Sequence, residues 1–262
     1  MGVICMTQEQ RRIYLIKVLL SEHKEYSGID IPDDAEGQKH LLRSLMNVRM
    51  PDKISEEFLR VQDEYLKEEI SHKGITDYTS LTQVKKDLYL WQGDITTLKC
   101  DAIVNAANKK MLGCFVPCHK CIDNAIHTYS GVQLRLECAE IMRNQRHDEK
   151  TGSAKITPAY NLPCKYIIHT VGPIVRGGVS KHDEELLASC YRSCLELAQK
   201  YSLKSIAFCC ISTGEFMFPN RRAAEIAIDT VSKYKEQTQS EIKVIFNVFK
   251  QVDLEIYREL LG

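Results

Sequence analysis

After residue 85 the sequence alternates between short apolar segments and longer amphipathic ones, and this alternation constrains the fold more than any other feature. The short segments are typical of buried β-strands and the longer ones of helices. Alternating strands and helices indicate an α/β fold, in which helices cover both faces of a sheet. The expected strands are Leu88–Trp91, Ala102–Asn105, Ser153–Thr157, Tyr166–Val171, Ser205–Ile211 and Ile242–Val248, and the expected helices are Asn124–Met142, Asp183–Lys200, Asn220–Tyr234 and Val252–Leu260.

Residues 1–84 have a different, helical pattern. Thr7 and Gln10 match a capping box, and apolar residues recur at helical spacing after it. Two more helices are expected to begin near Asp33 and near Ser55. No ligand-type constellation is visible here, so we interpret residues 1–84 as a helical extension packed on a main domain formed by residues 85–262.

Length and charge exclude several classes of protein. The chain has 262 residues, with 35 Lys and Arg against 35 Asp and Glu, which suits one large domain with an appendage. Zero net charge argues against an extended nucleic-acid or anionic-membrane surface. No apolar run approaches the ~20 residues that span a bilayer, and the first residues lack the features of a signal peptide. We therefore expect a cytoplasmic protein without a membrane span.

Cysteine is the unusual residue, because the chain has 11 and an odd number cannot pair completely. In a reducing compartment cysteines serve as buried apolar groups, metal ligands or catalytic groups rather than in disulfides. Cys209 and Cys210 fall in an expected strand, and Cys190 and Cys194 share one face of an expected helix. We interpret these four as buried apolar side chains.

A second group of cysteines is concentrated in one loop. Cys114, His119 and Cys121 form the pattern Cys-x4-His-x-Cys, and thiolates and imidazole are preferred zinc ligands. Three protein ligands with an open position are typical of a catalytic zinc site, whereas Cys118 as a fourth ligand would close the site. A metal-free cysteine nucleophile paired with His119 is the third alternative. We rank the three in this order.

The loops that follow the expected strands are the places to look for a ligand site, because α/β sheets bind ligands at the carboxyl ends of their strands. These loops follow Asn105, Val171 and Ile211. The last begins Ser-Thr-Gly at residues 212–214, just before a helix, and can present backbone N–H groups to a phosphate. Ordinary turn chemistry explains the same residues.

Two polar residues near the strand ends have two interpretations each. Asp94 can accept a hydrogen bond from an exocyclic amine or cap a helix. Asn108 can bind ribose hydroxyls or serve as a turn residue. Taken singly, each favours the structural interpretation.

Taken together and in order, the motifs resemble the macrodomain family, and within it the zinc-dependent microbial branch of protein-ADP-ribose hydrolases. The resemblance runs from about Leu88 to the C-terminus. Its motifs are Gly93-Asp94-Ile95-Thr96, Asn105-Ala106-Ala107-Asn108, the Cys/His loop running into Ile122-Asp123-Asn124, and Ser212-Thr213-Gly214-Glu215-Phe216. Ordinary macrodomains have a glycine-rich loop in place of the Cys/His loop. The resemblance implies a three-layer α/β/α sandwich with a mixed sheet, preceded by a helical extension.

The resemblance also implies a site for ADP-ribose and a Zn²⁺ cofactor. Asp94 and Ile95 would hold the adenine. The residues that would surround the pyrophosphate and its ribose are Ser212, Thr213, Gly214, Glu215 and Phe216. Those that would line the distal ribose are Asn108, Ile122, Asp123 and Asn124. The residues that match the family's metal ligands are Cys114, His119 and Cys121, and Cys118 is not among them.

The expected activity is hydrolysis of mono-ADP-ribose from a protein side chain, with an ester on Asp or Glu as the expected linkage. Asp123 would orient the water or accept its proton, while Asn108 fixes the ribose; the other interpretation of Asp123 is the N-cap of a helix starting near Asn124. His127 and His169 are expected to be core histidines that form hydrogen bonds. Zinc would polarise an ester or ribose oxygen or lower the pKa of bound water.

Two other functions fit the same residues. One is an ADP-ribose reader that binds without turnover, and the other is a hydrolase of O-acyl-ADP-ribose. The expected partner is a mono-ADP-ribosylated protein, and the resemblance adds a sirtuin-like ADP-ribosyltransferase and a lipoyl-carrier protein. Fold alone does not choose between them, because function belongs to the site.

Overall fold

A computed structural model describes residues 6–262 and begins with the helical extension. Its three α-helices are α1 (Gln8–Ser21), α2 (Ala35–Val48) and α3 (Glu56–Lys73), with a 3₁₀ turn η1 (Lys24–Tyr26) after the first. The side chains of Thr7, Asp34 and Ser55 cap the three N-termini by accepting backbone N–H bonds, and Thr7 forms the capping box with Gln10 that the sequence predicts.

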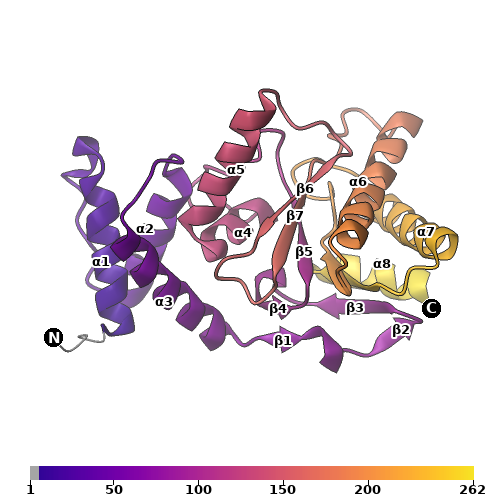
Figure 1. Ribbon diagram of the computed structural model, residues 1–262, viewed down its shortest axis with the longest axis horizontal. Helices are drawn as coiled ribbons and strands as arrows, with labels where there is room; N and C mark the ends of the chain where they lie inside the picture. Colours follow the sequence, from indigo (N-terminus) through magenta and orange to yellow (C-terminus); the bar gives the residue numbers. More distant parts are fainter. Residues whose placement is uncertain (1–5) are drawn as a thin grey trace.

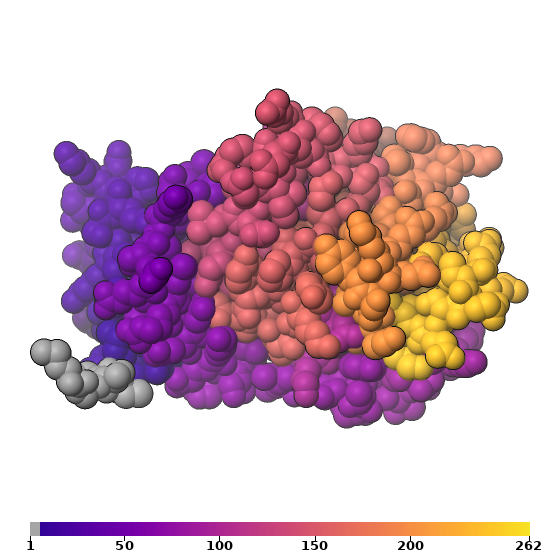
Figure 2. Space-filling view, viewed as in Figure 1, coloured from indigo at the N-terminus to yellow at the C-terminus, as the bar shows by residue number. Residues whose placement is uncertain are grey.

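The extension has its own apolar core. Helices α1, α2 and α3 bury one face each against one another, and Val132 of the main domain joins this cluster. Its fully buried members include Leu15, Ile16 and Phe58. The extension is thus packed on the main domain through a shared apolar contact, and Figure 2 shows no gap between the two.

Seven strands form the main sheet, in the order β2-β3-β9-β8-β5-β7-β6. Neighbouring strands from β3 to β7 run parallel, while the edge strands β2 and β6 are antiparallel to their neighbours. The strands are β2 (Gln83–Lys85), β3 (Leu88–Gln92), β5 (Ala102–Ala106), β6 (Ala154–Pro158), β7 (Tyr166–Thr170), β8 (Ser205–Phe208) and β9 (Lys243–Val248). The mixed sheet predicted from the sequence is confirmed.

Helices cover both faces of this sheet. They are α4 (Ile122–Ser130), α5 (Val132–Gln145), α6 (Lys181–Lys200), α7 (Asn220–Thr238) and α8 (Gln251–Leu261). Helices α4 and α5 lie between the sheet and the extension, whereas α6, α7 and α8 lie on the opposite side (Figure 1). None of the helices in residues 6–262 combines the length and the apolar composition required to cross a bilayer.

The segment that joins the extension to the main domain already belongs to the sheets. Strand β1 (Thr76–Asp77) pairs with β4 (Leu98–Lys99), and β2 pairs with β3. Short 3₁₀ turns, η2 (Tyr78–Ser80) and η3 (Ile95–Thr97), lie beside these strands. The helical part of the extension therefore ends at Lys73, and the following residues pair with main-domain strands.

Two expected elements differ from the structure. The single helix expected over 124–142 is two helices, because Gly131 has a φ of +97° and separates α4 from α5. The strand expected over 205–211 ends at Phe208, and the chain then leaves the sheet to form a loop. Cys209 is still buried and Cys210 half-buried in that loop, while Cys190 and Cys194 are buried on α6 as predicted.

Candidate active site

The carboxyl ends of five parallel strands meet at one edge of the sheet. The register pairs the last residues of β3 with those of β9, and the last residues of β5 with those of β7. Asp94 follows β3, Asn108 follows β5, and residues 212–216 follow β8. The parallel topology thus brings all three sequence motifs to the same edge, where open α/β sheets bind ligands.

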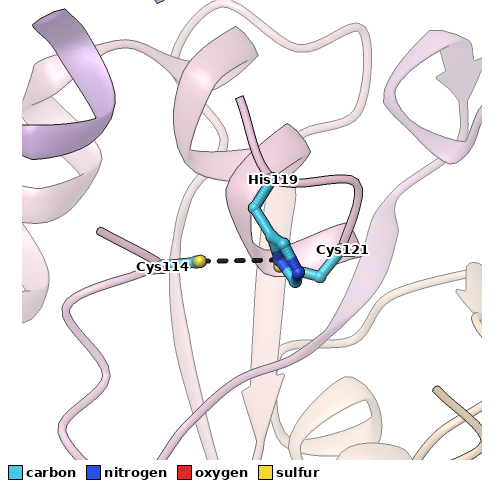
Figure 3. Close-up of side chains that lie close together, drawn as sticks. All are labelled: Cys114, His119 and Cys121. Carbon is cyan, nitrogen blue, oxygen red and sulfur yellow. Dashed lines mark hydrogen bonds between the residues drawn. The ribbon is translucent and has the colours of Figure 1, made fainter. Parts of the chain in front are cut away.

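The loop of residues 113–121, here called the metal loop, lies between β5 and α4. The donor atoms of Cys114, His119 and Cys121 all lie within 4.8 Å of one another, and Cys114 Sγ is 3.7 Å from His119 Nδ1. Figure 3 shows these side chains pointing toward a common centre. Cys121 is also the N-cap of α4, because its Sγ accepts the N–H of Asn124 at 3.4 Å.

These donors suit a thiophilic divalent cation. Two thiolates and one imidazole match the ligand preferences of zinc, and three of them leave one tetrahedral position for water or substrate. Burial, together with the nearby Cys114 thiol, raises the pKa of the Cys121 thiol to about 12. A metal ion has to displace a thiol proton to bind here, so its affinity would depend on pH. Cys114, His119 and Cys121 are the residues of this loop that can hold a metal.

Cys118 points away from this group. Its Sγ lies 3.2 Å from Ser44 Oγ and 3.5 Å from the carbonyl oxygen of His40, both in the extension. Its backbone has a φ of +51°, in the left-handed region that residues other than glycine rarely adopt. Among the described residues it is not a member of the donor group, so the geometry favours three ligands over the closed four-ligand arrangement.

Asp123 lies next to the metal loop, in the first turn of α4, and is surrounded by amides. Asn105 Nδ2 donates to its Oδ1 at 2.8 Å, and Asn108 Nδ2 donates to its Oδ2 at 3.3 Å. Asn108 also donates to the carbonyl oxygen of Gly113 at 3.1 Å, and its Oδ1 accepts the N–H of Lys110 in a turn. Asn108 is therefore both a turn residue and a neighbour of the carboxylate.

Asp123 is not the N-cap of α4, because Cys121 occupies that position. Its side chain is 8% exposed. Burial raises the pKa of its carboxyl to about 6, although the bonds from Asn105 and Asn108 and the charge of Arg135 act in the opposite direction. A buried carboxyl that ionises near neutrality can hold or release a proton in the site.

Behind Asp123 lies a second group of His and Cys donors, formed by His127, Cys138 and His169. His169 is satisfied without a metal: Asn105 Nδ2 is 3.1 Å from its Nδ1 and Thr157 Oγ1 is 3.0 Å from its Nε2. His169 is thus a core histidine that forms hydrogen bonds, as the sequence predicts. For His127 the prediction of a hydrogen bond is wrong: the ring is buried, but neither of its nitrogens has a hydrogen-bond partner among the described residues, and its Nε2 lies 3.6 Å from Asp123 Oδ1. Burial lowers the pKa of His169 to about 3 and also lowers that of His127.

The loop after β8 has the features of an anion site. Ser212 has a φ of +65°, and its buried Oγ has no hydrogen-bond partner among the described residues. A Cβ at Gly172 would overlap this Oγ, so only glycine allows the two loops to approach so closely. Within residues 6–262 the N–H groups of residues 214–216 donate to no protein acceptor, and such groups can bind phosphate oxygens.

Two contacts connect this edge of the sheet. Glu215 Oε1 lies 3.7 Å from His119 Nε2, so the loop after β8 reaches the metal loop. At the other end Asp94 caps η3 by accepting the N–H of Thr96 at 3.0 Å, while its Oδ2 accepts from Lys73 Nζ at 3.0 Å. Ile95 follows it and is buried. The structural interpretation of Asp94 is therefore correct, and one oxygen faces a cation of the extension.

Sequence reasoning missed four side chains that contact predicted site residues or the metal loop. Asn105 belongs to one of the sequence motifs, but no role was predicted for it. Its place at a strand end, three residues before Asn108, was the available indication. Arg43 and Asn47 contact the metal loop, and Lys73 contacts Asp94. They lie in helices of the extension, where nothing in the local pattern indicated a role.

Comparison with known proteins fits this geometry. The sequence matches the Macro domain family over residues 104–227. It is 58% identical to a protein-ADP-ribose hydrolase of Treponema medium over 98% of this chain and 100% of that protein. A protein-ADP-ribose hydrolase of Staphylococcus aureus strain Mu50 is 51% identical over 98% of this chain and 97% of that protein. This chain belongs to the macrodomain family.

Solved macrodomain structures have the same fold. A variant of the Oceanobacillus iheyensis macrodomain with ADPR superimposes with a TM-score of 0.62 at 37% identity, covering 69% of this chain and 95% of that one. The Trypanosoma brucei macrodomain in complex with ADP-ribose gives 0.66 at 29% identity, covering 84% and 95%. The macrodomain sandwich with preceding helices, expected from the motifs, is confirmed.

Proposed function

We propose that this macrodomain is a zinc-dependent hydrolase that removes mono-ADP-ribose from modified protein side chains, with an ester on Asp or Glu as its substrate linkage. One observation carries the proposal: the three metal donors and the Asn108–Asp123 pair lie on consecutive segments at the carboxyl edge of the sheet. The relatives named protein-ADP-ribose hydrolase and the structures with bound ADP-ribose support the activity and the ligand.

Different residues of the site would bind different parts of ADP-ribose. The N–H groups of residues 214–216, which have no acceptor in the described part of the chain, and the hydroxyl of Ser212 suit the diphosphate, which needs few cationic side chains when backbone amides bind it. Asp94 and Ile95 would hold the adenine, and Ile122, Asn124 and Asn108 would line the distal ribose. Zero net charge is compatible with this ligand because its charge is met locally.

Chemistry would take place beside Asp123. Hydrolysis consumes one water, breaks the ester between the distal ribose and the side-chain carboxylate, and releases ADP-ribose and the free Asp or Glu. Asp123 would orient that water and take its proton, while Asn105 donates a hydrogen bond to Asp123 Oδ1. Cys114, His119 and Cys121 would hold Zn²⁺, which supplies a Lewis acid to an oxygen of the substrate or water.

One assay tests this proposal. Metal-loaded and chelated protein is incubated with Asp/Glu-, Ser- and Arg-linked mono-ADP-ribosyl substrates, and released ADP-ribose is measured. We expect release from the Asp/Glu-linked substrate that stops on chelation and returns with zinc. Release that ignores chelation would contradict the zinc mechanism, and binding of ADP-ribose without release from any substrate would indicate a reader instead.

The partner and the compartment are tested separately. O-acetyl-ADP-ribose in the same assay separates a small-molecule esterase from a protein hydrolase. Cleavage of this ester without release of ADP-ribose from any modified protein would indicate the small-molecule esterase. An association with a sirtuin-like ADP-ribosyltransferase and a lipoyl-carrier protein predicts that their genes lie beside this one. Fractionation of cells tests the expected cytoplasmic location.

A further inference from the structure

Helix α2 of the extension contacts the metal loop through the loop's backbone. Asn47 Oδ1 accepts the N–H of Cys118 at 2.9 Å, and Arg43 Nη2 donates to the carbonyl oxygen of His119 at 3.1 Å. Asn47 is buried and Arg43 half-buried. Two consecutive residues of the loop, one of them a metal donor, are therefore held from outside the main domain.

The same two side chains also hold the helix that follows the loop. Arg43 Nη2 donates to Asn124 Oδ1 at 2.8 Å, and Asn47 Nδ2 donates to Thr128 Oγ1 at 2.9 Å. Asn124 Nδ2 in turn donates to the carbonyl oxygen of Val116 at 3.0 Å. The loop and the start of α4 are thus fixed to one another on both sides of Cys121.

The main domain fixes α2 at the same place. Arg135 of α5 is buried, and its Nη1 donates to the carbonyl oxygens of Met46 and Asn47 at 3.2 and 2.9 Å. Its Nε donates to the carbonyl oxygen of Leu112 at 2.7 Å, immediately before the metal loop. A cation at the C-terminal end of a helix is favourable. Helix α2 therefore cannot shift without disturbing the backbone that leads into the loop.

We propose that Arg43 and Asn47 are positioning residues for the metal site, and that the extension preorganises the three donors through them. A loop that is already ordered loses less conformational freedom when a metal binds, so its affinity is higher. This inference rests on the proposed metal binding. It assigns to α2 a function that the sequence pattern of the extension did not indicate.

The first test measures zinc affinity by competition with a chromogenic chelator. Arg43→Met removes the donors to His119 and Asn124 and is expected to weaken zinc binding about 10- to 100-fold, the usual effect of losing an outer partner of a metal ligand. The zinc affinity of Arg43→Lys should lie between those of wild type and Arg43→Met. Lys39→Met is the control: it lies on the same helix but contacts Glu36 and Glu69, and it should bind zinc like wild type.

The second test needs no metal. Hydrogen exchange in the chelated protein should be several-fold faster over residues 113–121 in Arg43→Met and in Asn47→Ala, with protection of α6 to α8 unchanged. If wild type binds no zinc, the proposed function fails while the exchange data still decide the positioning role. Folded variants with wild-type exchange and wild-type affinity would overturn the inference, and if Asn47→Ala does not fold, Arg43→Met alone decides.

Discussion

Burial and hydrogen bonding have opposite effects on the pKa of the Asp123 carboxyl. Its neighbours Asn105 and Asn108 donate to separate oxygens, so the carboxylate has a defined orientation beside the metal loop. Burying a carboxylate costs stability, and a catalytic role would explain why one is buried here. In the proposed mechanism this fixed orientation suits Asp123 for proton transfer.

The corresponding prediction is that Asp123→Asn lowers the rate of hydrolysis about 100- to 10,000-fold, the range supplied by a general base. Asn keeps an oxygen to accept from Asn105, so ADP-ribose binding, measured by calorimetry, should change only a few-fold. Full turnover in the metal-loaded variant would show that Asp123 has no part in proton transfer.

His169 gives a prediction about pH. Its pKa falls to about 3 on burial, whereas a histidine in the unfolded chain titrates near 6.5. Between these two values the unfolded state binds one more proton than the folded state. The free energy of unfolding therefore decreases as the pH is lowered from 6.5 toward 3. The slope for one proton is about 1.4 kcal/mol per pH unit.

His169→Asn keeps an acceptor for Asn105 but removes the titrating group, so its free energy of unfolding should depend less steeply on pH below 6.5. Urea unfolding at several pH values measures the slope. His182→Asn, at an exposed position of α6, is the control and should keep the wild-type slope. Equal slopes for His169→Asn and wild type would mean that the ring is charged in the folded protein.

At the scale of elements, Gly131 shows why a helical pattern did not give the correct boundary. The apolar spacing continues from α4 into α5, yet the backbone turns between them with a φ of +97° and a ψ of 172°. That region is accessible essentially to glycine alone. A Cβ here would also meet the Gln62 and Gln133 side chains at 2.6 Å. A local pattern carries no information about such a contact.

Gly131→Ala is therefore expected to destabilise the protein by about 1–3 kcal/mol, as judged by its thermal midpoint and urea unfolding. Gly28→Ala is the matched control, because a Cβ there meets nothing within 4 Å and its φ is not positive. A loss in Gly131→Ala no larger than in the control would mean that the chain between α4 and α5 relaxes without cost.

Local signals predicted the elements that depend on local chemistry. Thr7 and Ser55 cap helices as expected, and the strand-end motifs lie where parallel strands place them. The contacts around Asp123 were not predictable in the same way, since Asn105 and His169 come from different strands that only the sheet order brings together. The three metal donors were predictable because they lie in one loop.

At the scale of the whole molecule, the extension and the main domain meet at the site. Arg43 and His119 are 76 residues apart in sequence, and Lys73 reaches Asp94 from the end of α3. The sequence pattern of the extension does not predict these contacts, because they depend on how the two apolar cores pack against each other. The fold was predictable from motifs, whereas the contacts from the extension to the site were not.

Metal binding should therefore be visible in the stability of the entire chain. A ligand that binds only the folded state stabilises it by about 2.7 kcal/mol at 100 times its Kd. For a chain of this size, each kcal/mol shifts the midpoint by about 2–4 °C. Zinc should thus raise the midpoint of wild type by about 5–11 °C, and chelation should reverse the shift.

Two cysteine variants separate the donor set from its neighbour in that experiment. Cys114→Ser should remove the zinc-dependent shift, because it removes one of the three donors. Cys118→Ser should retain it, because Cys118 Sγ contacts Ser44 rather than the donor group. Loss of the shift in Cys118→Ser as well as in Cys114→Ser would identify a closed, four-ligand site, and the enzyme would then be a weaker assignment than the reader.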